Sequence, residues 1–158
     1  MYAYFAGGCF WCITPSFTEI DGVISVTSGY CGGDEINPTY EEVKSQSTGH
    51  RETIRVEYDE TKVNYKKLLD VFFDNVDLYD GGGQYIDRGF SYTLAVYYTD
   101  EKQKEAVEDK IKSYDKKVYV SLESYKTFYT AEEYHQDYYL KNPEAFEKEL
   151  IESGRKKN

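Results

Sequence analysis

The stretch AGGCFWC, residues 6–12, lies between a predicted strand and a predicted helix. Residues 1–5 are rich in aromatic side chains, which favours a strand. Over residues 13–20, apolar side chains recur at three- and four-residue spacing, which predicts a helix. Cys9 therefore follows a Gly-Gly turn at a helix start, where free N–H groups and the helix dipole favour an anion such as a thiolate. The stretch offers Cys9 as a candidate nucleophile.

The composition predicts one folded domain spanning residues 1–158. Aromatic residues make up 17% of the chain, including 18 Tyr, and this argues against disorder although 30% of residues are charged. A net charge of −10 disfavours nucleic acid and anionic membranes as partners, since like charges repel. No apolar run approaches the roughly 20 residues that cross a bilayer, and no signal peptide is evident. We expect a cytoplasmic monomer.

The three cysteines, an odd number, argue against a framework of structural disulfides. Cys9 and Cys12 form a Cys-x-x-Cys pair, whose spacing suits a reversible disulfide. The same spacing fits half of a zinc site, but only Cys31, His50 and His135 are left to complete one, so we expect no metal. A plainer alternative is that Cys9 is a small buried apolar residue.

Residues 50–58 alternate in a way that predicts a strand with two different faces. The mostly apolar face carries His50, Glu52, Ile54, Val56 and Tyr58, and the face expected to meet water carries Arg51, Thr53, Arg55 and Glu57. A carboxyl on a buried face should have a raised pKa, which would let Glu52 donate a proton near neutral pH. The alternative is a salt-bridged strand carboxylate without a chemical role.

The remaining pattern predicts a mixture of helices and strands. Helices are expected at residues 40–44, 63–75, 101–113 and 130–140 and from residue 143, with strands at 22–30, 90–98 and 118–122. A long glycine-rich loop covers residues 77–89, and such loops inside compact domains are usually functional. The fold class expected is α+β, with a mixed, mainly antiparallel sheet flanked by helices and a ferredoxin-like βαβ-type core.

Six segments together resemble the methionine sulfoxide reductase A family, whose members reduce methionine S-sulfoxide. They are GCFW at 8–11, GYCGG at 29–33, NPTYEEV at 37–43, TGHRE at 48–52, QYIDRGFSY at 84–92 and AEEYHQDYYLKNP at 131–143. The segments occur in order and cover essentially the whole chain, so the resemblance is much more specific than any single motif.

The resemblance implies a role for each matching residue. Cys9 is the expected nucleophile, and the side chains of Phe10 and Trp11 form a wall that holds the methyl group of the substrate. The groups expected to hold the sulfoxide oxygen are Tyr40, Glu52 and Tyr92, and Asp87 is a further acid of the site. Acid from Glu52 and hydrogen bonds from two phenols would stabilise the charge that develops on this oxygen.

The implied products are methionine and a sulfenic acid on Cys9. A second thiol then forms a disulfide, which thioredoxin or a similar dithiol reduces, so no cofactor is expected. Cys12 is the first choice for this resolving thiol because one helical turn can bring it to Cys9. Cys31 is the alternative, and direct attack by an external thiol is a third possibility, since no cysteine follows Cys31 in the sequence.

Two other functions remain compatible with the residues alone. A general thiol–disulfide oxidoreductase would use Cys9 and Cys12 but would need no buried Glu52. A module that binds oxidised methionine without reducing it would use the aromatic wall and would not need the thiol of Cys9.

Overall fold

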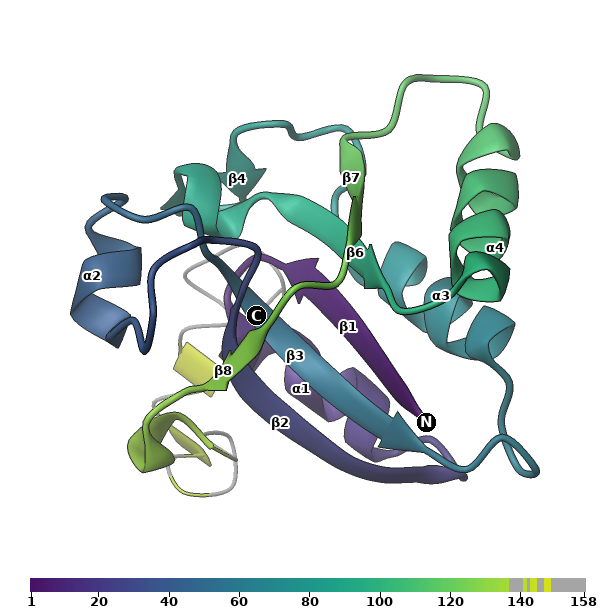
Figure 1. Ribbon diagram of the computed structural model, residues 1–158, viewed down its shortest axis with the longest axis horizontal. Coiled ribbons are helices and arrows are strands. Elements are labelled where there is room, and N and C mark those ends of the chain that lie inside the picture. The colour runs from purple at the N-terminus through teal and green to yellow at the C-terminus, as the bar shows by residue number, and fades with distance from the viewer. Residues whose placement is uncertain (137–140, 142, 145–146, 149–158) are drawn as a thin grey trace.

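A computed structural model describes residues 1–136, 141, 143–144 and 147–148. A six-stranded sheet with the order β7-β6-β1-β3-β2-β8 forms its centre (Figure 1). The strands are β1 (Tyr2–Gly7), β2 (Val23–Cys31), β3 (Arg51–Tyr58), β6 (Leu94–Tyr98), β7 (Val120–Ser124) and β8 (Phe128–Thr130). Of these neighbours only β6 and β7 pair in parallel. The expected mixed, mainly antiparallel sheet of an α+β fold is therefore confirmed.

Helices cover one face of this sheet and one of its ends. They are α1 (Phe10–Thr18), α3 (Tyr65–Asp74) and α4 (Glu101–Lys112), and the short α2 (Tyr40–Lys44) stands apart at the other end (Figure 1). The ring of Phe5 in β1 stacks between those of Phe17 in α1 and Phe72 in α3, with centroids 5.4 and 5.1 Å away. This aromatic contact joins the first strand to both helices at the centre of the core.

The helices α2, α3 and α4 begin where polar side chains accept from free backbone N–H groups, whereas α1 has no such cap. Asn64 accepts from the N–H of Lys67 at the start of α3, and Asp100 accepts from that of Gln103 at the start of α4. At α2 the Thr39 side chain forms a capping box with Glu42. The cap fixes where α2 begins, and hence where Tyr40 lies.

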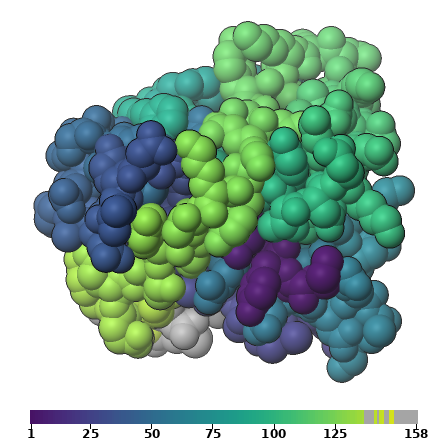
Figure 2. All heavy atoms as spheres, in the orientation of Figure 1, coloured from purple at the N-terminus to yellow at the C-terminus, as the bar shows by residue number. Residues whose placement is uncertain are grey.

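A strap, residues 124–128, covers the other face of the sheet. It runs from β7 to β8 across the front of β1 and β3 (Figure 1), and in the space-filling view its light-green atoms lie over this part of the sheet while purple atoms near the N-terminus stay visible (Figure 2). The ring of Tyr125 stacks on that of Tyr4 at 4.4 Å, and Phe128 closes the far end. The strap therefore creates a second small core on this face.

The strap makes one sequence expectation wrong. The face of β3 that carries Arg51 and Thr53 was expected to meet water, yet these two residues are 6% and 0% exposed. Alternation shows which residues share a face, but the strap that buries this face comes from more than 70 positions further along the chain. The opposite face, with Glu52, Ile54 and Val56, is buried as expected.

The segment after the strap also differs from expectation. A helix was expected over residues 130–140, with Thr130 at its start, but Thr130 ends β8 and pairs with Gly29. Only a 3-10 turn, η2 (Glu133–His135), follows, and residues 137–140 lie outside the described part of the chain. Residues 143 and 144 are helical as expected, while the tail at 155–157 also lies outside the described residues.

The predicted strand over residues 90–98 is shorter than expected, because its first part is the 3-10 turn η1 (Phe90–Tyr92). The glycine-rich loop before it contains a small hairpin of β4 (Gly83–Gln84) and β5 (Asp87–Arg88). The hairpin and η1 therefore place residues 87–92 outside the main sheet.

The aromatic contact at the centre of the core predicts a large effect of Phe72→Ala on stability. The side chain is fully buried, and removing it should lower the free energy of unfolding by about 3–5 kcal/mol, because the loss of apolar burial is added to the cost of a cavity. Denaturant unfolding measures this, with Lys67→Ala on the exposed side of the same helix as the control. A loss of less than about 1 kcal/mol would contradict the packing described.

Candidate active site

Cys9 lies two residues after Gly7, the last residue of β1, and directly before Phe10, the first residue of α1. It is the N-cap of α1, with extended backbone, and the residue is 9% exposed. Gly8 before it has a φ of 87°, which is a left-handed conformation that favours glycine. A Cβ at Gly7 would lie 3.0 Å from the ring of Phe72. The glycines thus allow a tight strand-to-helix turn against the core, and Cys9 lies where the sequence predicted.

The thiol of Cys9 lies beside the thiol of Cys12 and near two acids. A side-chain hydrogen bond with Cys12 is the largest influence that raises the pKa of Cys9, followed by burial and by the charges of Glu52 and Asp87. The helix start was expected to favour a thiolate at rest. Burial and neighbouring acids outweigh it, so the resting group is a thiol whose proton must leave when the reaction begins.

Glu52 reaches the same point from β3. Its carboxyl Oε1 accepts a hydrogen bond of 3.3 Å from the backbone N–H of Phe10, the residue after Cys9. The side chain is 1% exposed, and burial raises the pKa of Glu52 to about 8, with a smaller contribution from the charge of Asp87. At neutral pH the group is a neutral acid that can donate a proton, as the sequence predicted.

The hydroxyl groups of Tyr40 and Tyr92 complete the cluster. Burial and the charge of Glu52 raise the pKa of both hydroxyls, so both keep their protons. The two hydroxyls share a side-chain hydrogen bond, and that of Tyr92 also acts on the Glu52 carboxyl and lowers its pKa. Among the described residues, none offers a hydrogen bond of full geometry to the second carboxyl oxygen of Glu52, Oε2, which is buried.

Asp87 approaches from the small hairpin. It lies in β5, it is half-buried, and its charge contributes to the raised pKa of Cys9, Glu52 and both tyrosines. The expected nucleophile, three oxygen-binding groups and further acid therefore come together from five separate elements: the cap of α1, α2, β3, β5 and η1.

Aromatic rings line the region beside Cys9, and one of them was not singled out from the sequence. Phe10 is fully buried, while Trp11 is half-buried and lies near Tyr40, with ring centroids 6.3 Å apart. His135 is 1% exposed and lies 4.3 Å from the Tyr40 ring, and its Nδ1 accepts a 3.1 Å hydrogen bond from Trp11 Nε1. Burial lowers the pKa of His135, which keeps the ring neutral and able to accept this bond.

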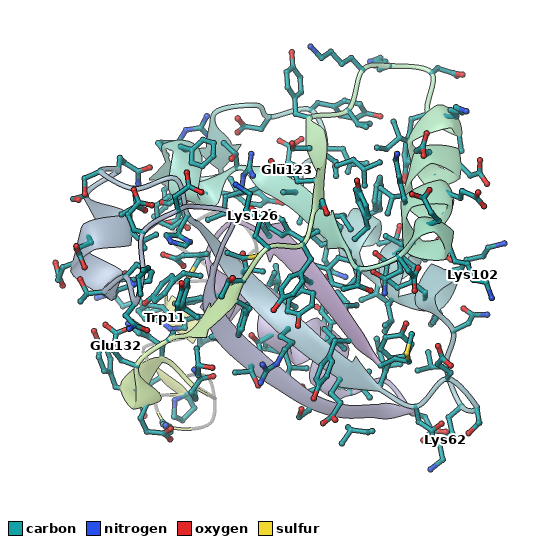
Figure 3. The ribbon with its side chains drawn as sticks, viewed as in Figure 1. Trp11, Lys62, Lys102, Glu123, Lys126 and Glu132 are labelled. Carbon is teal, nitrogen blue, oxygen red and sulfur yellow. The ribbon has the colours of Figure 1, made fainter. Side chains whose placement is uncertain are left out.

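Glu132 is a second residue that sequence reasoning passed over. Its two carboxyl oxygens accept from the Tyr30 hydroxyl at 2.8 Å and from the backbone N–H of Tyr40 at 3.0 Å. Figure 3 shows Glu132 and Trp11 on the same side of the molecule, close to α2. Because the sequence predicted a helix here, Glu132 and His135 were interpreted as part of its polar face. The only signal for a role of these two residues was their place in the last segment that resembles the family.

A family model described as peptide methionine sulfoxide reductase matches residues 1–158. The chain belongs to this family. Peptide methionine sulfoxide reductase MsrA 2 of Staphylococcus aureus is 44% identical over 161 residues, which cover 98% of this chain and 91% of the relative. The reduced form of Mxr1 from Saccharomyces cerevisiae is a similar solved structure, with a TM-score of 0.83 and 26% identity over 90% of this chain and 86% of that one. A second similar structure is methionine sulfoxide reductase A of Corynebacterium diphtheriae, with a TM-score of 0.81 and 29% identity over 90% of this chain and 74% of that one.

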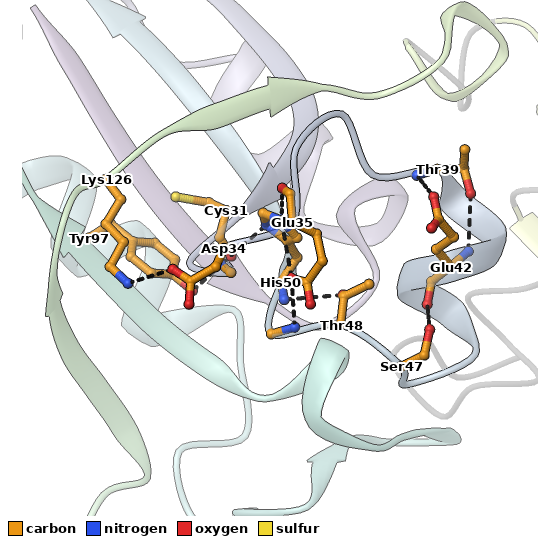
Figure 4. A network of polar contacts seen from close by, with 12 residues as sticks. Cys31, Asp34, Glu35, Thr39, Glu42, Ser47, Thr48, His50, Tyr97 and Lys126 are labelled. Atoms are coloured by element: carbon orange, nitrogen blue, oxygen red, sulfur yellow. Dashed lines mark hydrogen bonds and ion pairs between the residues drawn. The ribbon is translucent and has the colours of Figure 1, made fainter.

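In this reductase-family chain, Cys31 lies on the other side of the sheet from Cys9. Its neighbour Tyr30 pairs with Glu52 in the core under α1, whereas Cys31 pairs with Arg51 and packs with Tyr97 under the strap. Burial raises the pKa of Cys31 to about 12. Figure 4 shows Cys31 beside Tyr97, whose hydroxyl donates to the Cys31 carbonyl at 3.2 Å.

His50 has a structural position at the end of β3. Its Nδ1 accepts from the N–H of Gly33 at 3.2 Å, and its Nε2 lies 2.9 Å from the carbonyl of Glu35 (Figure 4). Among the described residues, no group of three or more His, Cys, Asp or Glu side chains is arranged to hold a metal ion. In the same part of the chain, no helix has both the length and the apolar character needed to cross a membrane.

The contact between two acids and the Cys9 thiol predicts the effect of Glu52→Gln on thiol reactivity. The charge of Glu52 raises the pKa of Cys9, so its removal should lower that pKa and move the pH profile of alkylation to lower pH. Iodoacetamide labelling followed by mass spectrometry of the Cys9 peptide measures the profile. Glu60→Gln, an exposed site, should leave it unchanged. An unshifted profile in Glu52→Gln would show that the two groups do not interact.

Proposed function

We propose that this chain reduces the S-epimer of methionine sulfoxide, free or in proteins, to methionine. Membership of the peptide methionine sulfoxide reductase family supports the reaction. The observation that carries the proposal for the site is the convergence of the Cys9 thiol, a protonated Glu52 and two tyrosine hydroxyls on one point. Such a set combines a nucleophile with an acid and two hydrogen-bond donors, which an oxygen leaving a sulfoxide requires.

The proposed first step transfers the oxygen from the substrate to Cys9. Glu52 protonates the sulfoxide oxygen while Tyr40 and Tyr92 donate hydrogen bonds to it, the Cys9 thiol passes its proton to the carboxylate that this leaves on Glu52, and the Cys9 sulfur forms a bond to the transferred oxygen. The sulfur–oxygen bond of the substrate breaks, the methionine sulfur gains two electrons, and the Cys9 sulfur loses two electrons to become a sulfenic acid. Overall, one thiol and one sulfoxide give one sulfenic acid and one thioether. We assign Trp11, supported by Phe10, to the wall against the substrate methyl group. We assign Asp87 to keeping Glu52 protonated, because its charge raises the pKa of Glu52.

In the second step, we propose that the thiol of Cys12 attacks the Cys9 sulfenic acid, which releases water and leaves a disulfide. The side-chain hydrogen bond between the two thiols supports this choice. Cys31, the alternative, would have to cross the sheet from the small core under the strap.

The proposed reductant of this disulfide is thioredoxin or a similar protein dithiol, and no cofactor takes part. Yeast Mxr1 has been solved in complex with Trx2, which supports a partner of this kind. The step exchanges one disulfide for another and returns Cys9 and Cys12 to thiols. A general thiol–disulfide oxidoreductase is not favoured, because exchange alone would use neither the buried acid nor the tyrosine pair.

The finer points of architecture are also proposals. We propose a single domain over residues 1–158 with a ferredoxin-like core, supported by the β1-α1-β2-β3-α3-β6 succession and the antiparallel order β6-β1-β3-β2 within the sheet. We propose a monomer in the cytoplasm, supported by the net charge of −10 and the odd number of cysteines.

The acid role predicts a specific pH dependence. Because burial raises the pKa of Glu52 to about 8, the proton is present below that pH and lost above it, so the rate of methionine formation in a single turnover should fall as pH rises through 8. Glu52→Gln should lower this rate about 100-fold or more and remove the alkaline decline. Cys9→Ser should abolish the reaction, and Glu60→Gln is the matched control. A decline at the same pH in Glu52→Gln would exclude Glu52 as the acid.

The resolving role predicts different losses for the two remaining cysteines. Cys12→Ser should still form one methionine per enzyme but lose cycling with thioredoxin, because the sulfenic acid has no internal partner. Cys31→Ser should keep both. Product counts with and without thioredoxin, together with mass spectrometry of the disulfide, measure this outcome. Normal cycling in Cys12→Ser with loss in Cys31→Ser would reverse the assignment.

A further inference from the structure

The hydroxyl of Tyr92 is placed by a segment that has little support of its own. Residues 89–93 form the short 3-10 turn η1 and its flanks, with no strand pairing before β6 begins at Leu94. We propose that Gln46 and Arg51 are positioning residues, which hold this segment from two sides and so fix Tyr92. The proposal rests on the proposed role of Tyr92 at the sulfoxide oxygen.

Gln46 holds the segment through Ser91, the residue before Tyr92. Its side-chain carbonyl accepts from the Ser91 N–H at 2.9 Å, while its side-chain amide donates to the Ser91 hydroxyl at 2.7 Å and to the Lys44 carbonyl at 3.1 Å. A Cβ at Gly89 would lie 2.7 Å from the Gln46 amide carbon, so the chain approaches this side chain closely. Gln46 itself has a φ of 66°, an uncommon conformation for a residue with a side chain.

Arg51 holds the same segment from inside the sheet. Its Nε donates to the Thr93 hydroxyl at 2.8 Å, and its guanidinium lies over the Phe90 ring at 4.4 Å. The Thr93 hydroxyl in turn donates to the Phe90 carbonyl at 2.7 Å. One planar side chain thus touches the residues on both sides of the Ser91–Tyr92 pair.

The Arg51 guanidinium is itself fixed from behind. It pairs with the Glu123 carboxylate at 2.6 Å and donates to the Tyr97 hydroxyl at 3.0 Å, and Arg51 is only 6% exposed. Figure 3 places Glu123 on the strand that leads into the strap. A buried guanidinium with an ion pair, two hydroxyl partners and a ring is held in one orientation, which the ammonium of lysine would not reproduce.

Both holding residues are chain neighbours of the other oxygen-binding groups. Arg51 directly precedes Glu52 in β3, and Gln46 follows the end of α2, whose first residue is Tyr40. The two contacts therefore tie Tyr92 to the elements that carry both of its chemical partners. Because the acid and the two donors act on one oxygen, small errors in their separation should lower kcat more than they raise KM.

The test combines Gln46→Gly and Arg51→Lys with Tyr92→Phe, singly and as two double variants. Glycine accepts a positive φ, so Gln46→Gly removes the holding amide without straining the backbone. Arg55→Lys is the matched control, because Arg55 lies on the same strand and face without contacting η1. Reduction of a blocked S-sulfoxide with dithiothreitol gives kcat and KM, and denaturant unfolding reports stability.

We expect each of the two single variants to lower kcat about tenfold with KM nearly unchanged, and Arg55→Lys to have no effect on kcat. When either substitution is added to Tyr92→Phe, kcat should fall almost no further than in Tyr92→Phe alone. Gln46→Gly should lose kcat while its unfolding midpoint stays at the wild-type value, which a purely structural role would not produce.

Two results would overturn the proposal in different ways. If Tyr92→Phe lowers kcat but the two substitutions lower it equally in both backgrounds, Gln46 and Arg51 do not act through Tyr92, and the proposed function stands. If Tyr92→Phe has wild-type kcat, the oxygen site itself is wrong and the positioning role is lost with it.

Discussion

The 3.3 Å hydrogen bond from the backbone N–H of Phe10 to the carboxyl of Glu52 is the contact on which the site depends. It joins the first turn of α1 to the middle of the sheet, so it fixes the position of Cys9 relative to Glu52. A buried carboxyl that has one backbone donor and little water keeps its proton, because the charged form would lose more hydration than a single donor returns. The fold thereby places the protonated carboxyl of Glu52 beside the thiol of Cys9, and both groups are neutral in the free protein.

The aromatic surroundings serve the same purpose by excluding water. The rings of Trp11, Tyr40 and His135 pack against one another in stacked and tilted arrangements, and Glu132 fixes the start of α2 through the backbone N–H of Tyr40. Each of these contacts joins elements that are distant in sequence, which explains why the site needs the whole chain and not only the first turn of α1. In such a dry environment, the electrostatic effect of each donor on a developing charge is stronger than in water.

Much of this arrangement follows from the sequence for identifiable physical reasons. The Gly-Gly turn required a strand-to-helix transition at Cys9, and the alternation in β3 placed Glu52 inside and predicted its raised pKa. The burial of Arg51 could not be predicted in this way, because periodicity does not reveal that a distant strap covers the second face. Thr130 failed as a helix start because its backbone pairs with Gly29 and the Gln136 side chain bonds to Ser28 instead. The thiolate expected at Cys9 was wrong, because the rule about helix ends omits the hydrogen bond with Cys12, the burial of the thiol and the charges of Glu52 and Asp87, which together raise its pKa.

The closeness of Cys9 and Cys12 within one helical turn has a consequence for the order of events. In the proposed cycle both thiols of the disulfide belong to the same turn, so the protein dithiol would approach it from the side on which the sulfoxide binds. The proposed cycle therefore predicts ping-pong kinetics, in which the sulfoxide oxidises the enzyme and leaves as methionine before the dithiol binds and reduces it. Cys31 is fully buried beneath the strap on the other face of the sheet, away from this proposed exchange.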